Sequence, residues 1–420
     1  MLKRFHIRGF KSAENLEVEL APLVVVFGPN ASGKSNFLDA LVLLSRLVTE
    51  RTLADAFGPP LRGYPIEAFT LPVTGLEGLL AQNDANLTLE AIVEPRSANG
   101  SRPPADLLYR VGVRVHPPTG ALSVVEENLA RLKRDGAPAG TARIEVSDGS
   151  IVIRRVGETG QPRKERLGQS HTQASNLQFT GEKYPDFDRL RHEMSAWRSY
   201  YLDPRVAMRE AQPPRELTDI GPLGQWLAPF LYRLKETHDL SARFQAVRRA
   251  LHSAIPTIED LDVDLDRKRG ILDIRIVQDG TPFSSRVISE GTLRVLALCA
   301  IAVNPWASSL VAFEEPENGV HPRRIEVIAD LLHSMVSAQQ SQVVVTTHSP
   351  TLVAAMVRKQ REDPDRIRIL ACQRAGRAST LRAFDTGGRL FEDREIAAAL
   401  KCSEEDGLVE AILRRGWMDG

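Results

Sequence analysis

The chain has 420 residues, of which 42% are hydrophobic and 26% charged, and its 54 Lys and Arg residues balance its 54 Asp and Glu residues. These fractions are typical of folded globular proteins and exclude wholesale disorder and a collagen-like repeat. Because the net charge is zero, binding to nucleic acid or to anionic lipid needs a local basic patch. The 3 cysteines form no CxxC pair, which argues against a cysteine zinc site and an oxidising compartment.

Neither a targeting segment nor a membrane segment is expected. Charged residues interrupt the first twenty positions every few residues, unlike a signal peptide. No stretch reaches the roughly 18 uninterrupted apolar residues that a membrane helix needs. We therefore expect a cytoplasmic protein, with two or three packing units at this length.

The first 48 residues predict two strands, a buried strand and a helix. Alternating apolar residues over 2–7 and 16–20 indicate the first two strands, and the apolar run 23–27 indicates a buried one. A glycine-rich turn follows. After it, apolar residues at Phe37, Leu41, Leu44 and Val48 lie on one face of a helix. The order is therefore strand, glycine loop, helix.

Prolines recur about every dozen residues between positions 95 and 256, which excludes a long coiled coil there. Short alternating runs at 108–115 and 151–156 predict a small antiparallel sheet. Helices are expected after it, over 224–236 and 242–253. This region is predicted to be a compact insert.

Strands and helices alternate again after position 258. The pattern predicts strands at 271–277, 310–313 and 343–347, with helices over 291–303 and after Pro322. Such alternation is typical of a mostly parallel sheet covered on both faces, which the two ends of the chain would share.

The segment GPNASGKS at 28–35 matches the pattern G-x-x-x-x-G-K-[ST] and lies between a predicted strand and a predicted helix. Glycines allow backbone amides to approach phosphate oxygens, the helix N-terminus adds positive potential, Lys34 reaches the β- and γ-phosphates, and the Ser35 hydroxyl binds Mg²⁺. The residues expected to hold ATP are Gly28, Pro29, Asn30, Ala31, Ser32, Gly33, Lys34, Ser35 and Asn36.

Two acids end the next informative strand. Glu314 and Glu315 follow an apolar run, where a P-loop enzyme needs a carboxylate for the metal and a base for the attacking water. Successive strand residues point in different directions, so we assign the metal side to Glu314 and the general base to Glu315. An acidic strand end before Pro316 is the alternative, and Asp is the more usual residue at the metal position.

His348 follows the apolar strand over 343–347 and would lie at the carboxyl edge of the sheet, where open α/β sheets bind ligands. We predict a hydrogen bond from His348 to the γ-phosphate. The segment SEGT at 289–292 precedes a helix, so Ser289 and Gly291 either contact a phosphate or form a plain helix cap.

Together these segments resemble the ABC-type ATPases of the SMC, RecF and OLD-like group. More narrowly they resemble its AAA-type predicted ATPases, which carry an SxGT signature and an EEPExGxHP box, here at 289–292 and 314–322. The implied fold is α/β: a P-loop ABC-ATPase-like head with a mostly parallel sheet, plus an antiparallel β subdomain and a helical insert. The expected domains are 1–95 and 256–386 for the two halves of the head, 96–255 for the insert, and 387–420 for a short helical tail.

The resemblance implies an ATP-dependent, Mg²⁺-dependent homodimer in which Ser289 and Gly291 of one copy contact the γ-phosphate held by Lys34 of the other. Asn318 and Gly319 would lie at the dimer seam. Hydrolysis by Glu315 with His348 would open the dimer. We expect a switch acting on DNA, in repair or anti-phage defence, with a separate effector such as a nuclease. The alternatives are the ATPase subunit of a membrane transporter and a non-hydrolysing scaffold.

Three features depart from the group or stay open. No glutamine can be assigned to the Q-loop, for which Gln82 and Gln178 are both possible. About 50 residues follow Leu370, too few for a Toprim nuclease, and 391–395 is predicted to begin a charged helix. Basic residues between 131 and 166 offer a nucleic-acid patch, although interleaved acids favour a solvated face. These residues are Arg131, Lys133, Arg134, Arg154, Arg155, Arg163, Lys164 and Arg166.

Overall fold

The structure is a computed structural model that describes residues 1–96, 105–157, 161–306 and 308–384. Its contacts divide the chain into two compact units. The first comprises Met1–Ala21, Pro29–Trp197 and Cys372–Arg382, and the second Pro22–Gly28, Arg198–Ala371 and Ala383–Gly420. The expected domain limits stay a prediction, and the expected tail over 387–420, including 391–395, lies outside the described residues.

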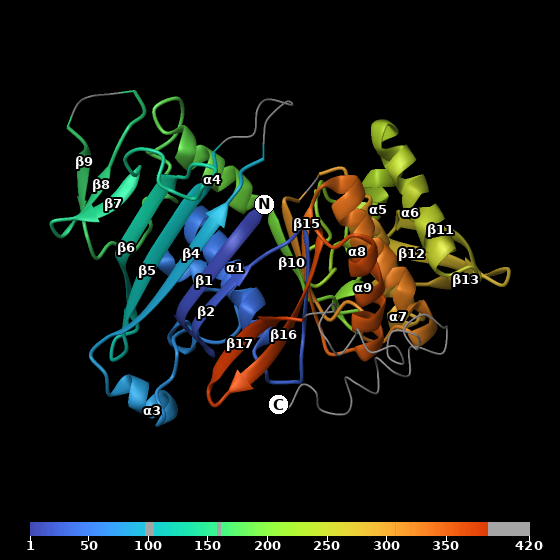
Figure 1. The fold of residues 1–420 in the computed structure, drawn as a ribbon. Coiled ribbons are helices and arrows are strands. Elements are labelled where there is room, and N and C mark those ends of the chain that lie inside the picture. Colours follow the sequence, from blue (N-terminus) through green and yellow to red (C-terminus); the bar gives the residue numbers. More distant parts are fainter. Residues whose placement is uncertain (97–104, 158–160, 307, 385–420) are drawn as a thin grey trace. The chain divides into compact units, whose positions relative to one another are not determined.

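An antiparallel sheet forms the centre of the first unit (Figure 1). Its strands, in spatial order, are β2 (Ala13–Glu19), β1 (Leu2–Phe10), β4 (Ala85–Val93), β5 (Leu107–His116), β6 (Ala121–Arg131), β7 (Ile144–Ser147), β8 (Ser150–Ile153) and β9 (Arg163–Arg166). The antiparallel sheet expected from the insert is therefore larger, because β1 and β2 from the N-terminus pair with it through β4.

Helices pack against this sheet and against one another. Helix α1 (Lys34–Thr49) buries the predicted apolar face, including Phe37, Leu41, Leu44 and Val48. It contacts β1 and helix α4 (Pro185–Ser195). The shorter helices of this unit are α2 (Leu53–Ala56), α3 (Gly75–Leu80) and the 3-10 helix Pro65–Ala68.

A second sheet carries the predicted parallel strands. Its order is β10 (Trp197–Tyr200), β14 (Leu310–Glu314), β15 (Gln342–Thr347), β3 (Leu23–Phe27), β16 (Ile367–Ala375) and β17 (Ala378–Ala383). Strands β14, β15, β3 and β16 are parallel neighbours. Strand β3, from the start of the chain, lies between two strands from its end, so the expectation that both ends share one sheet is confirmed.

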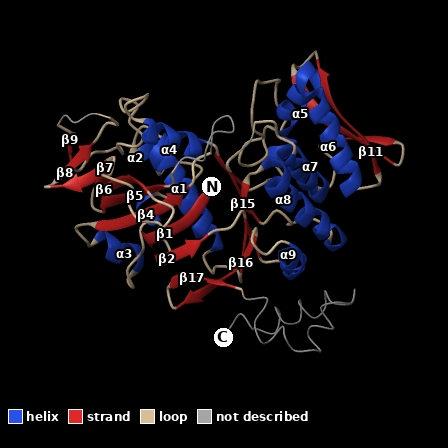
Figure 2. Ribbon diagram, turned by 45° about the horizontal axis from the view of Figure 1, so that its top comes forward, coloured by secondary structure: helices blue, strands red, loops and turns tan. Residues whose placement is uncertain are grey.

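Helices α8 (Ile325–Gln339) and α9 (Pro350–Glu362) of the second unit contact each other (Figure 2). Both also contact β3. Helix α7 (Glu290–Ala302) is buried along almost its whole length, and α5 (Leu227–Glu236) and α6 (Ser241–Ala254) contact it. The remaining short helices are Ala207–Arg209, His238–Leu240 and Pro322–Arg324.

One predicted strand forms, but it belongs to a different sheet from the parallel one that we expected. The strand expected at 271–277 is β12 (Ile271–Gln278), which pairs antiparallel with β11 (Ile258–Asp266) and β13 (Thr281–Ser284) in a separate sheet. Periodicity fixes which face of a strand is buried but not which partner it has, so β12 could not be told from a strand of the parallel sheet. No helix in the described ranges is both long and apolar enough to cross a membrane.

Candidate nucleotide-binding site

The predicted phosphate loop connects β3 to α1, as the sequence pattern requires. Ala31 and Gly33 have positive φ angles of 64° and 108°, and α1 begins at Lys34. A Cβ added at Gly33 would lie 2.0 Å from the Ser379 hydroxyl, so only glycine fits this position. The first N–H groups of a helix have no partner within the helix itself, so a loop that leads into a helix start is suited to bind an anion.

Lys34 and Ser32 are both buried in this loop. The Lys34 ammonium donates to the Pro29 carbonyl, 2.9 Å away, and so folds back over the loop. The Ser32 hydroxyl is buried and has no hydrogen-bond partner within the described residues. A buried hydroxyl without a partner costs free energy, which an anionic oxygen bound in the loop would recover. These donors fit a nucleotide phosphate.

Two neighbouring segments hold the loop by side-chain hydrogen bonds. The Ser32 carbonyl accepts from the Ser379 hydroxyl at 2.6 Å and from the Cys372 thiol at 3.4 Å. Ser12, in the turn between β1 and β2, joins Ser379 and Asn36 through its hydroxyl, at 2.7 Å from each. Burial raises the pKa of the Cys372 thiol, so it stays protonated and donates. Of these partners the sequence predicted only Asn36.

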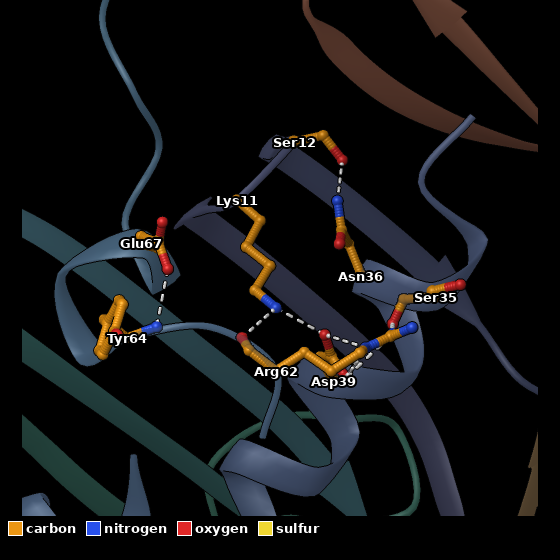
Figure 3. A network of polar contacts seen from close by, with 8 residues as sticks. All are labelled: Lys11, Ser12, Ser35, Asn36, Asp39, Arg62, Tyr64 and Glu67. Carbon is orange, nitrogen blue, oxygen red and sulfur yellow. Dashed lines mark hydrogen bonds and ion pairs between the residues drawn. The ribbon is translucent and has the colours of Figure 1, made fainter. Parts of the chain in front are cut away.

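A charged cluster lies beside the same helix turn (Figure 3). Asp39 of α1 is almost fully buried and accepts from the Lys11 ammonium at 2.6 Å. The Arg62 guanidinium pairs with Asp39 at 3.0 Å and donates to the Ser35 carbonyl at 2.8 Å. This cluster ties the β1–β2 turn, α1 and the segment around Arg62 together, next to Ser35. Sequence reasoning missed it, since no local pattern links residues 11, 39 and 62.

A hollow of about 230 Å³ adjoins this region of the first unit. Its lining includes Lys11, Ser12, Phe69, Arg374 and Arg377. The same turn residues that hold the phosphate loop thus also border an open space.

In the second unit, three parallel strands deliver the other predicted residues to one edge. Thr347 of β15 lies opposite Phe27 of β3, and Thr346 lies opposite Glu314 of β14. Glu315 and His348 directly follow β14 and β15, and Gly28 directly follows β3. This carboxyl edge is where open α/β sheets bind ligands.

The Glu315 carboxylate is held from two sides. His348 Nδ1 lies 2.8 Å from Oε1, and the Asn318 amide donates to Oε2 at 2.6 Å. Glu315 itself has φ 48°, an uncommon conformation for a residue with a side chain, and its backbone N–H donates to the Thr346 carbonyl at 2.9 Å. Such local strain is found preferentially at functional sites. The structure therefore brings the predicted base and the predicted histidine into contact.

A second carboxylate, which sequence reasoning did not single out, lies near this pair. Glu317 is buried and accepts from the Thr347 hydroxyl, while its Oε2 has no partner within the described residues. Burial raises the pKa of Glu317. Arg294 of α7 is buried nearby, and its guanidinium lies 3.4 Å from the Glu315 carbonyl.

The SEGT segment forms a helix cap in this structure. Ser289 accepts from the Thr292 N–H at 3.2 Å and thereby caps α7, which is the plainer of the two interpretations. A Cβ on Gly291 would lie 2.5 Å from the Gly319 carbonyl, so the start of α7 packs directly on the turn after Glu315. Whether Ser289 and Gly291 also contact a phosphate stays a prediction.

The predicted residues therefore fall into two groups. Glu314, Glu315, His348, Ser289 and Gly291 belong to the second unit, together with Gly28. The residues at 29–36 belong to the first. Ser35 and Glu314 offer the hard oxygen ligands that Mg²⁺ prefers. The Q-loop residue stays unassigned.

Comparison with known protein families identifies the chain. A family model described as "AAA domain, putative AbiEii toxin, Type IV TA system" matches residues 23–107 and 141–354, which is more than half of the chain. The chain belongs to this family. The matched ranges include the phosphate loop, the SEGT segment, both acids and His348.

Curated relatives of this AAA-domain protein match over short segments. The DNA replication and repair protein RecF of Listeria welshimeri is 44% identical over 55 residues, which cover 13% of this chain and 15% of RecF. RecF of Rhodococcus erythropolis is 31% identical over 102 residues, which cover 24% of this chain and 23% of that RecF. The chain thus matches less than a quarter of the length of these relatives.

Among solved structures, an Smc head bound to the C-winged helix domain of ScpA is similar, with a TM-score of 0.52 and 14% sequence identity. The match covers 91% of this chain and 98% of that one. At this identity the likeness concerns the fold. The family match, the RecF segments and the likeness in fold agree with the predicted resemblance to the SMC/RecF-like ABC-type ATPases, and the expected α/β head is confirmed.

Proposed function

We propose that this protein hydrolyses ATP with Mg²⁺ and uses the reaction to open and close a dimer that works on DNA. The observation that carries the proposal is the Glu315 carboxylate, held by His348 and Asn318 at the sheet edge where β3 leads into the phosphate loop. A general base needs a fixed position and a hydrogen-bonded partner that orients it. Glu315 has both.

The proposal assigns a role to each group at the site. Backbone amides of the phosphate loop and the Lys34 ammonium bind the phosphates, and the Ser35 hydroxyl and Glu314 bind Mg²⁺. The bound nucleotide supplies the phosphoanhydride bond that is broken. Glu315 accepts the proton of the attacking water, and His348 orients Glu315 and senses the γ-phosphate. The hollow beside Ser12 offers room for the adenine ring of the nucleotide.

The client and the partners rest on the relatives. RecF is named as a DNA replication and repair protein, which supports DNA as the client. Heads that share a nucleotide between two copies would leave Ser289 and Gly291 facing the partner copy's phosphate. A separate effector such as a nuclease, a role in anti-phage defence and a cytoplasmic location stay predictions.

The test is ATP turnover by the purified full chain with Mg²⁺. Glu315→Gln keeps the size of the side chain but removes the base, so turnover should fall about 100-fold or more while ATP binding persists. The matched control is Glu236→Gln, an exposed change at the end of α5 that should leave turnover unchanged. A wild-type chain without turnover would support a non-hydrolysing scaffold instead, and unchanged turnover in Glu315→Gln would show that another group is the base.

A further inference from the structure

A hollow lined by arginines lies beside β9. Strand β9 forms one edge of the eight-stranded sheet, and β2 forms the opposite edge (Figure 1). Its volume is about 460 Å³. The polar side chains that line it come from the β7, β8 and β9 region. They are Thr141, Arg143, Arg154, Arg155, Gln161 and Arg163.

Positive charge exceeds negative charge around this hollow. Arg143, which lines the hollow, shares the buried Asp186 carboxylate at 2.9 Å with two guanidinium groups outside the lining, those of Arg131 at 2.7 Å and Arg189 at 3.1 Å. One carboxylate neutralises one charge, so this group alone keeps an excess of two positive charges.

The other arginines of the hollow do not reverse this balance. Arg154 pairs with Glu145 and Arg163 pairs with Glu165, one to one. Arg155 donates to the Tyr184 hydroxyl at 3.1 Å. The hollow is therefore electropositive, although the whole chain has no net charge.

Size and geometry favour a nucleotide over a bare phosphate. The volume lies in the range of small-ligand pockets and exceeds what a phosphate group needs. The Arg163 guanidinium lies over the buried Phe179 ring, 5.2 Å from its centre. Arginine forks bind phosphate oxygens in pairs, and a planar guanidinium also stacks on a base. The Thr141 hydroxyl and the Gln161 amide can bond a base edge.

We propose that this arginine hollow binds a nucleoside phosphate, at a site separate from the P-loop. Two sources share this chemistry: the terminal nucleotide of a nucleic-acid strand and a free nucleotide. The proposal does not depend on ATP hydrolysis, because no residue of the hollow belongs to the P-loop or to the Glu315 cluster.

The experiment measures binding of a short oligothymidylate with a 5′-phosphate and a 3′-fluorophore, by fluorescence anisotropy. The full chain carries Lys34→Ala, so that nucleotide bound at the P-loop does not contribute. Arg155→Gln with Arg163→Gln should weaken binding about tenfold or more, and should lower the salt dependence by about 1.4 in log–log slope, as expected for two lost phosphate contacts to a single strand.

The matched control removes two positive charges from β9, the strand of Arg163. Lys164 and Arg166 alternate with Arg163 along β9 and so point to its other face, and Lys164→Gln with Arg166→Gln should change the affinity less than about twofold. Equal losses in both double variants would overturn the proposal in favour of general surface electrostatics. Thermal melting checks that the variants are folded. If the Arg155→Gln, Arg163→Gln double variant is not folded, binding is measured with Arg155→Gln alone, a change at an exposed residue.

Two further measurements distinguish the end of a nucleic-acid strand from a free nucleotide. Stronger binding of the 5′-phosphorylated strand than of its 5′-hydroxyl counterpart would support a strand end, and displacement of the probe by thymidine monophosphate at similar concentration would support a free nucleotide. No binding of either, or better competition by a phosphoserine peptide, would overturn the proposal.

Discussion

Glu127 shows how one buried carboxyl can set a pH dependence that is unrelated to the nucleotide site. It is fully buried in β6 and accepts from the Tyr109 hydroxyl at 3.1 Å and from the backbone N–H groups of Gln173 and Ala174 at 2.7 and 2.8 Å. Burial raises its pKa from 4.5 to about 7 although these hydrogen bonds oppose the shift. The charged form is therefore disfavoured in the folded state.

The sign of the effect on stability follows from proton binding. Between pH 4.5 and about 7 the folded chain keeps the Glu127 proton that the unfolded chain has lost. The contribution of Glu127 is thus fully present below pH 4.5 and is lost as the pH rises through about 7. The loss is on the order of 3 kcal/mol in the free energy of unfolding.

Urea unfolding of the wild type and of Glu127→Gln at pH 5 and pH 8 tests this prediction. The variant cannot ionise and leaves one donor without an acceptor, so it should be less stable than the wild type at pH 5, with a smaller deficit at pH 8. Glu126→Gln, a more exposed change in the same strand, should keep the wild-type pH dependence. An equal deficit at both pH values would mean that Glu127 is ionised in the folded chain throughout.

At the scale of elements, the Asp39 cluster should stabilise α1, the helix that begins directly after the phosphate loop. Asp39→Ala would leave the Lys11 and Arg62 charges without their shared carboxylate, at a cost of about 1–3 kcal/mol in the free energy of unfolding. Asp39→Asn keeps one acceptor oxygen and should cost less.

The control for this measurement is Asp84→Ala. Asp84 forms a half-exposed ion pair with Arg114 at 3.7 Å, so its loss should change stability by less than about 0.5 kcal/mol. If Asp39→Ala and Asp84→Ala were equally mild in urea unfolding, the cluster would not hold these elements together.

The elements that local patterns encode were predicted well, and their partners were not. The run at 23–27, the glycines after it and the apolar face of α1 follow from periods of two and 3.6 residues, and these features lie where the sequence placed them. By contrast, Ser379 reaches Ser12 across 367 positions, and nothing in the neighbourhood of either residue indicates the other.

The candidate site shows the same limit. Motifs identified Glu315 and His348, because each follows an apolar strand whose end faces the sheet edge. The Asn318 amide that donates to Glu315 belongs to the same turn, in which Glu315 has a positive φ angle, and the sequence reveals neither that angle nor the contact. The β11–β12 pairing was missed because alternation alone does not name a partner strand.

At the scale of the whole molecule, the proposed dimer makes a prediction about mixed subunits. In a symmetric pair that shares nucleotide, each site combines the Lys34 loop of one copy with the Ser289 segment of the other. Lys34→Ala should abolish phosphate binding, and Ser289→Arg should block the shared face, so each variant alone should be inactive.

Mixing the two variants in equal amounts should restore ATP turnover. Half of the dimers would then be mixed, and one of the two sites in each would be intact, which gives about a quarter of the wild-type rate. A loss of the Ser289 cap costs about 1 kcal/mol, so thermal melting must show that Ser289→Arg is folded at the assay temperature. If turnover does not return on mixing although both variants are folded, the site is completed within one copy, because only a site shared between copies can be rescued by complementation.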